Sequence, residues 1–136
     1  MTTPRPHPNR RVNRVVVGIL RSRLHPVLSG VLVEIRYRGR RSGRWFSLPA
    51  QYAMDVGRPD TVVVYPGHPD RKVWWRSFLE DAEANLVVRG VEHSATGVVV
   101  DAGGADRGWA VDTYTHRFRK VRIPDSAPLV VFTLDA

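Results

Sequence analysis

The chain has 136 residues, of which 43% are apolar and 25% charged, and it contains no cysteine. These values are typical of one soluble globular domain with a single core, and they exclude disulfides and thiolate chemistry. No uncharged stretch approaches the roughly 20 apolar residues of a membrane-spanning helix. No clear cleavage site follows the short apolar run at residues 15–20, so we expect a cytoplasmic protein.

The net charge of +8 is distributed unevenly along the chain. Residues 1–44 contain eleven arginines and one acid, Glu34, whereas residues 45–136 hold ten basic and twelve acidic residues. A basic sector of this kind predicts an anionic partner: a phosphate, a polycarboxylate, an anionic lipid or a nucleic acid. A solvated surface that keeps the protein soluble is the alternative.

The N-terminal region is expected to contain a tail and one helix. Residues 1–9 are rich in proline and predict a disordered tail, whereas residues 10–136 are expected to form the single domain. Between residues 10 and 23 the apolar side chains recur with a helical period, and the arginines lie mostly elsewhere. This pattern predicts a basic amphipathic helix that packs on the domain or rests on the inner face of an anionic membrane.

Beyond residue 30 the period of the apolar residues changes to two, which predicts strands. Six strands are expected, the second of them broken by Pro49, at residues 31–38, 44–54, 61–66, 84–92, 93–101 and 128–134. Helical spacing is found at residues 73–81 and 104–118. The sequence therefore predicts a mainly β (α+β) fold, a six-stranded split antiparallel β-barrel with two or three short helices.

Motifs of self-contained catalysis are missing from the sequence. The five histidines include no HxxxH pair, which argues against a metal site. Nucleophile-elbow, phosphate-loop and dinucleotide-binding glycine motifs are absent, and the carboxylates are scattered singly. An enzyme of this sequence would take its reactivity from a bound cofactor.

The segment IRYRGRRSGR, residues 35–44, concentrates five arginines around one turn. Gly39 and Gly43 permit positive φ and a close approach of the backbone. Backbone amides there could hold a phosphate by charge-assisted hydrogen bonds, together with the side chains of Arg40, Arg41, Ser42 and Arg44. A solvated basic loop is the alternative.

A second candidate for ligand binding is the segment GHPDRKVWW, residues 67–75, in which a loop enters a helix. Asp70 is the expected N-cap, and free amides at this helix start would suit an anion. Trp74 and Trp75 would point about 100° apart on a helix, so one can enter the core while the other borders a pocket. Two core tryptophans are the alternative.

These segments follow the order VEIRYRGRRSGRWFSLPAQY, VVVYPGHPDRKVWWRSF, a strand pair, a helix and IPDSAPLVVF. That order resembles the deazaflavin-dependent nitroreductase family, a branch of the split β-barrel, flavin-reductase-like oxidoreductases. The resemblance runs from about Val15 to Phe132. Its most specific parts are the G-R-[RK]-[ST]-G turn with a downstream proline and Tyr52, and the K-x-WW-R-x-[FL] helix start. The family is common in actinobacteria, which agrees with the arginine-rich composition.

The resemblance implies a cofactor and the residues that bind it. The family uses coenzyme F-420, an 8-hydroxy-5-deazaflavin with a phosphodiester and an oligoglutamate tail, as hydride donor. By resemblance, Pro49 and Tyr52 would shape the wall near the ring, and further ring contacts would come from Val64, Tyr65, Lys72, Val73, Trp74 and Ser77. The phosphate and the polyanionic tail would be held at the turn by Arg40, Arg41, Ser42, Gly43 and Arg44.

Two departures from the family pattern affect the expected activity. Family members often have asparagine where Ser77 stands, and nitroreducing members carry several tyrosines around the C-terminal helix. Here that helix keeps Tyr114 but offers Arg117, Arg119 and Lys120 instead, which argues against nitroimidazole-type activity. Tyr114 is the candidate proton donor or substrate wall, with ordinary packing as the alternative.

The leading interpretation is an F-420-dependent oxidoreductase that passes hydride to an electron-poor acceptor such as an enone, a quinone or a nitro compound. A second interpretation has the same fold but a different role: the protein would carry F-420 or FMN and catalyse no reaction. A small basic barrel that binds RNA or single-stranded DNA is a third interpretation, although no nucleic-acid partner is expected under the first. The protein is expected to be a monomer or a homodimer, and its N-terminal helix could contact a membrane peripherally.

Overall fold

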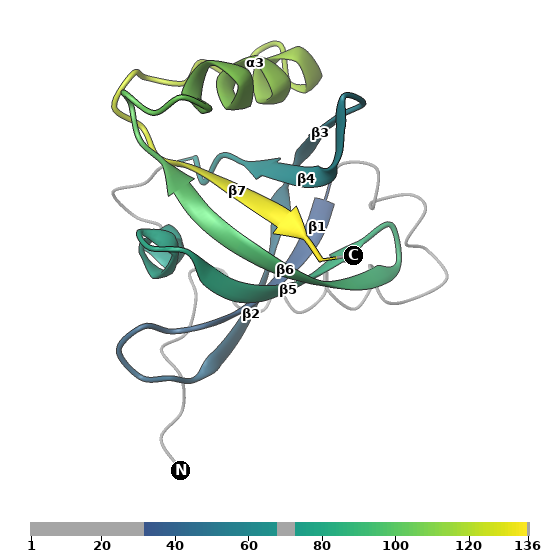
Figure 1. Ribbon diagram of the computed structural model, residues 1–136, viewed down its shortest axis with the longest axis vertical. Coiled ribbons are helices and arrows are strands. Elements are labelled where there is room, and N and C mark those ends of the chain that lie inside the picture. The colour runs from purple at the N-terminus through teal and green to yellow at the C-terminus, as the bar shows by residue number, and fades with distance from the viewer. Residues whose placement is uncertain (1–31, 68–72, 136) are drawn as a thin grey trace.

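The computed structural model describes residues 32–67 and 73–135. The predicted tail and N-terminal helix, and with them Asp70 and Lys72, lie outside these described residues. The described chain forms one sheet of seven antiparallel strands in the order β2-β1-β5-β6-β7-β4-β3. The sheet curls into a half-barrel, and helix α3 lies across one end of it (Figure 1).

The strands and helices are β1 Leu32–Arg38, β2 Trp45–Gln51, β3 Ala53–Asp55, β4 Arg58–Val64, the 3-10 helix η1 Trp74–Phe78, β5 Ala82–Val88, β6 Val91–Val100, α3 Arg107–Arg117 and β7 Leu129–Leu134. The mainly β, antiparallel prediction is confirmed. The predicted number of six strands is wrong, because the described residues form seven. The prediction of two or three short helices is also wrong for these residues, which form one α-helix, α3, while the segment predicted as the other helix forms only the five-residue 3-10 helix η1.

The additional strand arises where the predicted second strand divides into β2 and β3, on either side of Tyr52. These two strands lie at opposite edges of the sheet, so the chain passes from one edge to the other at this residue. Pro49 does not break the strand as predicted, because it lies inside β2 opposite Glu34. Among the described strands β2 pairs only with β1, and such an edge position accommodates a residue without a backbone N–H.

The main core fills the concave side of the curled sheet. Alternate residues of β1 point into it, and η1 contributes Trp74 and Phe78, which are four residues apart as predicted. The rings of Phe78 and Phe132 meet edge-on with their centroids 5.1 Å apart. Gly97 makes this contact possible, because a Cβ at that position would lie 2.6 Å from the Phe132 ring and 2.8 Å from the Phe78 ring.

A second, smaller core lies between the sheet and α3. Val63 of β4 packs there against Ala110 and Tyr114, whereas Val62 and Val64 face the main core. Because β4 is covered on both faces, its apolar residues form a continuous run instead of an alternating one. The buried strand expected at residues 61–66 is thus explained by α3 on its outer face.

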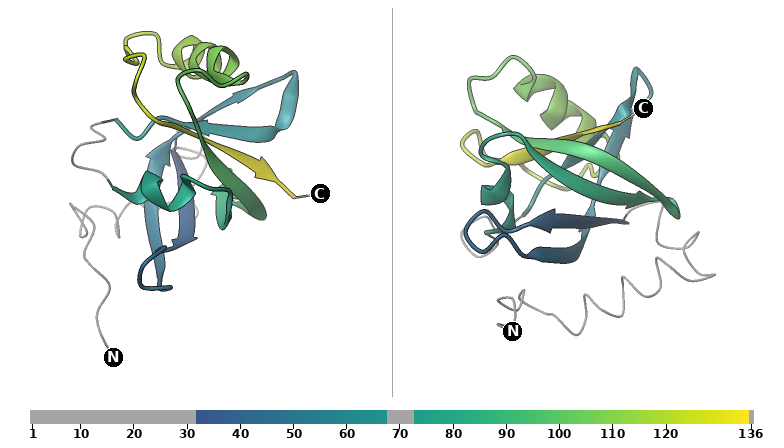
Figure 2. Two further views of the ribbon diagram at one scale, coloured as in Figure 1. Left: turned by 60° about the vertical axis from the view of Figure 1, so that its left-hand side comes forward. Right: turned by 60° about the horizontal axis from the view of Figure 1, so that its bottom comes forward.

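Polar contacts fix α3 at its N-terminal end. The buried guanidinium of Arg107 donates to the carbonyl oxygens of Val100, Pro124, Asp125 and Ala127. The indole Nε1 of Trp109 donates to Asp55 at 2.8 Å, so the helix is also tied to the β3–β4 turn. Both further views show α3 against the same end of the sheet (Figure 2). Among the described residues, no helix has the length and apolar character needed to cross a membrane.

Candidate functional site

A pocket of about 310 Å³ lies where the end of β2 meets η1, the segment after β4 and the α3 region. Ligand pockets typically measure roughly 300–1,000 Å³, so this one suits a ring-sized head group with the rest of a larger ligand outside. Its lining residues are Leu32, Leu48, Pro49, Ala50, Gln51, Tyr65, Pro66, Gly67, Trp74, Tyr114 and Val121.

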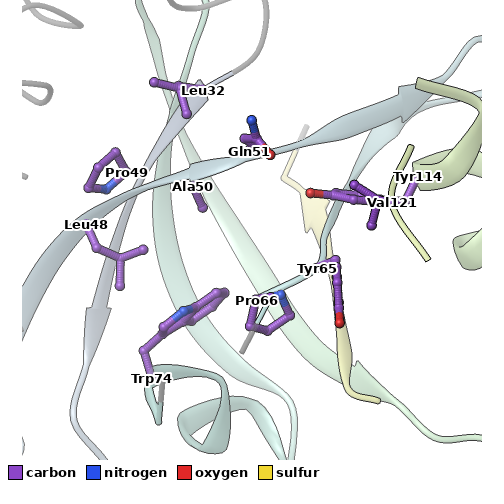
Figure 3. A pocket seen from close by; sticks show the side chains of 11 residues that line it. Leu32, Leu48, Pro49, Ala50, Gln51, Tyr65, Pro66, Trp74, Tyr114 and Val121 are labelled. Atoms are coloured by element: carbon purple, nitrogen blue, oxygen red, sulfur yellow. The ribbon is translucent and has the colours of Figure 1, made fainter. Parts of the chain in front are cut away.

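The pocket has two facing walls of different character (Figure 3). One wall consists of Leu48, Pro49 and the indole of Trp74, while Tyr114 and Val121 lie on the other side. Most of the lining is apolar or aromatic, and few polar side chains reach it. Such a slot excludes water from a bound ring and leaves a small number of groups to orient it.

Tyr114 is the most distinctive polar group of the pocket. Its side chain is 2% exposed, and burial, with a smaller contribution from Tyr65, raises its pKa to about 12. The hydroxyl therefore keeps its proton at neutral pH, and its tip is directed toward the pocket (Figure 3). No other described residue forms a hydrogen bond with it. A buried hydroxyl without a partner costs about 1–3 kcal/mol, so this one is suited to a ligand.

Neighbouring rings hold Tyr114 in place. Tyr65 stands edge-on to it with the ring centroids 5.8 Å apart, and the Phe118 ring lies 4.8 Å away on a tilted plane. Edge-on and tilted pairs are favourable arrangements of aromatic rings. The hydroxyl is thus presented by a packed side chain on a helix that is itself tied to the sheet.

Trp74 belongs to the main core and also lines the pocket, with 4% of its surface exposed. Trp75 is half-buried, does not line the pocket, and has the guanidinium of Arg76 5.5 Å from its ring centroid. The sequence predicts one tryptophan in the core and the other at the pocket, but Trp74 alone occupies both places. The N-cap of η1 is Val73 instead of the predicted Asp70, and no side chain caps this helix.

The arginine turn between β1 and β2 is held together by hydrogen bonds among its own residues. The amide of Gly39 donates to the Arg44 carbonyl at 2.7 Å, the amide of Gly43 donates to the Gly39 carbonyl at 2.9 Å, and the Arg44 amide donates to Ser42 Oγ at 3.2 Å. Gly43 has a φ of 67° as expected, whereas Gly39 is needed for close approach, because a Cβ there would lie 2.7 Å from the Phe46 ring. Three amides expected to hold a phosphate are therefore engaged inside the turn.

The turn is distant from the pocket. Arg44 directly precedes β2, and four residue steps separate it from Leu48, the first residue of β2 that lines the pocket, which at roughly 3.3 Å per residue corresponds to about 13 Å. Arg40 and Arg41 are exposed at the far end. A ligand that contacts both regions must therefore be long and carry its negative charge away from the ring.

The sequence-predicted site residues fall into three groups. Pro49, Tyr65, Trp74 and Tyr114 line the pocket together. Tyr52 and Val64 are buried in the main core, Val73 is exposed and Ser77 is half-buried, and none of these four lines the pocket. The third group is the arginine turn, and Lys72 lies outside the described residues.

Sequence reasoning missed seven of the eleven lining residues, among them Gln51 and Val121. Gln51 ends β2 two residues beyond Pro49, so its proximity could have been found by extending that strand. Val121 follows α3 and reaches the pocket only through the return of the chain, for which the sequence carries no local signal. In the described ranges, no group of three or more His, Asp or Glu residues could hold a metal ion.

The fold of this protein is similar to that of a known structure, whereas its sequence matches no known family. No family model and no curated protein matches the sequence. The structure of an F420-H2 dependent reductase aligns with a TM-score of 0.55 and 12% identity, over 74% of this chain and 92% of that chain. A FAD and heme binding protein from Mycobacterium smegmatis aligns with a TM-score of 0.48 and 18% identity, over 85% of this chain and 67% of that chain. The likeness to the reductase establishes a similar fold.

Proposed function

We propose that this protein is an oxidoreductase that transfers hydride from reduced coenzyme F-420 to an electron-poor organic acceptor, such as an enone, a quinone or a nitro compound. The observation that carries the proposal is the buried, protonated hydroxyl of Tyr114, directed into an apolar pocket opposite Trp74. The likeness of the fold to that of an F420-H2 dependent reductase supports the choice of cofactor.

The residues of the pocket fit the head group of this cofactor. Trp74, Leu48 and Pro49 offer an apolar wall for a flat ring, and the pocket volume leaves the tail outside. The tail would extend along β2 toward Arg40 and Arg41, whose guanidinium groups suit phosphate and carboxylate. When bound, the coenzyme supplies the hydride, and the chain supplies binding, orientation and the exclusion of water.

Tyr114 is the proposed proton donor. Reduction of an enone adds hydride to one carbon and a proton to the other, so a donor must stand beside the acceptor. With a pKa of about 12, the hydroxyl is fully protonated at neutral pH and is a weak acid. It can donate as negative charge develops on the acceptor and then be reprotonated from solvent.

Binding and turnover test the proposal separately. Calorimetric titration of the purified protein with F-420, FMN, FAD and haem should give tight binding for F-420. Acceptors added to the reduced complex should then restore the absorbance of the oxidised deazaflavin. Absence of F-420 binding would contradict the proposal, and binding without reoxidation by any acceptor would favour a carrier.

One observation favours a second candidate function, the binding of single-stranded nucleic acid. Trp45 is 50% exposed at the start of β2, and the guanidinium of Arg38 lies 5.8 Å from its ring centroid. An exposed indole beside several arginines is suited to stacking a base near a phosphate. Affinity for an oligonucleotide that falls steeply with salt and is lost in Trp45→Ala would support this function.

A further inference from the structure

A second basic segment borders the pocket on the side opposite β2. Residues 117–122, RFRKVR, contain four basic residues and no acid. Within this segment Val121 lines the pocket, and Tyr114 precedes it by less than one helical turn. Arg119, Lys120 and Arg122, the basic residues on either side of Val121 in the sequence, are exposed. Three exposed basic residues therefore flank in sequence a residue of the pocket wall on the Tyr114 side, and we call Arg119, Lys120 and Arg122 the cationic rim.

Arg119, Lys120 and Arg122 differ from some other basic residues of the molecule, because no described carboxylate pairs with them. Arg36 pairs with Glu34 and Glu92, both at 2.8 Å, and Arg58 pairs with Asp106 at 3.2 Å. Arg119, Lys120 and Arg122 form no ion pair with any described residue. Within residues 32–67 and 73–135, no ion pair therefore neutralises their positive charge.

Stabilisation of helix α3 explains the presence of only some of the basic residues in this segment. Cations in the last turn of a helix interact favourably with its C-terminal carbonyl groups, and His116 and Arg117 occupy that turn of α3. The helix ends at the C-cap Phe118, so the other three basic residues lie beyond it. The effect falls off within the last turn, which leaves those three without a role in the helix.

The arginine turn and this rim are well separated. The β1–β2 turn and α3 lie at opposite ends of the molecule in Figure 1 and in the left view of Figure 2. A cofactor tail that runs along β2 to the turn leaves the rim free. The rim is next to Tyr114, where the proposed proton donor must meet the acceptor.

We infer that the physiological acceptor is an anion, an electron-poor molecule with a carboxylate or similar group that the Arg119–Arg122 rim recognises while its reducible bond lies beside Tyr114. This inference rests on the proposed function and names the substrate class of the same site. The redox step is unchanged: the acceptor gains one hydride and one proton, and the deazaflavin loses two electrons. The rim binds a part of the acceptor that does not react.

A matched pair of probes tests the inference. (E)-3-Benzoylacrylate is an electron-poor enone with a carboxylate, and its methyl ester has the same reducible bond without the charge. The chain has no cysteine to add to either compound. Their dissociation constants are measured by tryptophan fluorescence on the free protein and on protein saturated with oxidised F-420, which permits no turnover. The KM for each is then measured with reduced F-420.

Two variants remove equal charge from the two basic regions. Arg119→Gln/Lys120→Gln alters the rim, and Arg40→Gln/Arg41→Gln alters the turn; all four side chains are exposed. The rim variant should weaken binding of the acid about three- to tenfold and leave the ester unchanged, as expected for loss of two partly screened charges. The turn variant should weaken F-420 binding and retain the preference for the acid. Circular dichroism and thermal unfolding establish that both variants fold.

Equal affinity of the wild type for acid and ester would overturn the inference, as would an undiminished preference for the acid in the rim variant. Failure of the proposed function gives a different result. In that case F-420 does not bind to the wild type, while the titrations of the free protein still compare the acid with its ester. A third variant, Arg122→Gln added to the rim pair, should weaken binding of the acid further.

Discussion

The pocket and the arginine turn lie at two ends of the same strand, β2, and they are built by different forces. Trp74 and Tyr114 in the pocket are almost fully buried and are fixed by packing. The turn is exposed, and its shape depends on hydrogen bonds within its own backbone. Removal of a buried ring from the pocket is therefore expected to alter folding and binding together, whereas charge in the turn can be altered with the fold intact.

The largest difference between the two regions is expected for their tryptophans. Trp74→Ala removes a buried indole that contacts the rings of Tyr37 and Phe78, and should lower the free energy of unfolding by about 3–5 kcal/mol. Trp45→Ala removes a half-exposed indole and should change that free energy by less than about 1 kcal/mol. Urea denaturation measures both values, and similar losses would remove the distinction.

The second prediction concerns the pocket hydroxyl. Tyr114→Phe should lower kcat about 100-fold or more, because the proton donor is lost, and should change F-420 affinity less than about threefold. The matched control is Tyr37→Phe, since burial also raises the pKa of Tyr37 to about 12, but this residue lies in the core outside the pocket. Turnover with reduced F-420 measures both, and an equal effect in both variants would exclude a specific role for Tyr114.

The third prediction compares two exposed turns. Arg41→Glu in the β1–β2 turn should weaken F-420 binding about five- to thirtyfold, because it reverses a charge beside the anionic tail. Arg89→Glu in the β5–β6 turn changes the net charge equally and should have little effect. Calorimetric titration at two salt concentrations separates the two variants. Unchanged affinity in Arg41→Glu would place the tail elsewhere.

The smallest effect is expected for the contact that ties α3 to the sheet. Hydrogen bonds from Trp109 and from the Gly57 amide hold the pKa of Asp55 below its ordinary value of about 3.9. Because the folded-state pKa is the lower one, the stabilisation is complete above the ordinary value and is lost as the pH falls through the folded value. The indole N–H resonance of Trp109 should shift below about pH 4 in the wild type and remain constant there in Asp55→Asn.

Much of the fold could be predicted because it depends on local periodicity. Alternation in β1 and the four-residue spacing of Trp74 and Phe78 correspond to buried faces in the structure. The division at Tyr52 could not be predicted, because it depends on the return of the chain to the far edge of the sheet. The prediction for Pro49 is wrong for a related reason: a proline breaks a central strand but not an edge strand, and edge position is a property of the whole sheet.

The site could be predicted only in part. Trp74 is predicted from a local motif and Tyr114 from the family resemblance, and both line the pocket. The engagement of the Gly39, Gly43 and Arg44 amides inside the turn depends on backbone geometry that the sequence does not specify. The rim at residues 119–122 acquires its place only because Val121 returns to the pocket after α3.

The central claim is that a deazaflavin ring binds between Trp74 and Tyr114 while its anionic tail extends to the arginine turn. A crystal structure of the protein with bound F-420 tests this most directly. We expect electron density for the ring against the Trp74 indole and for the tail at Arg40 and Arg41. Density for the ring outside this pocket, with Trp74 and Tyr114 free of the ligand, would contradict it.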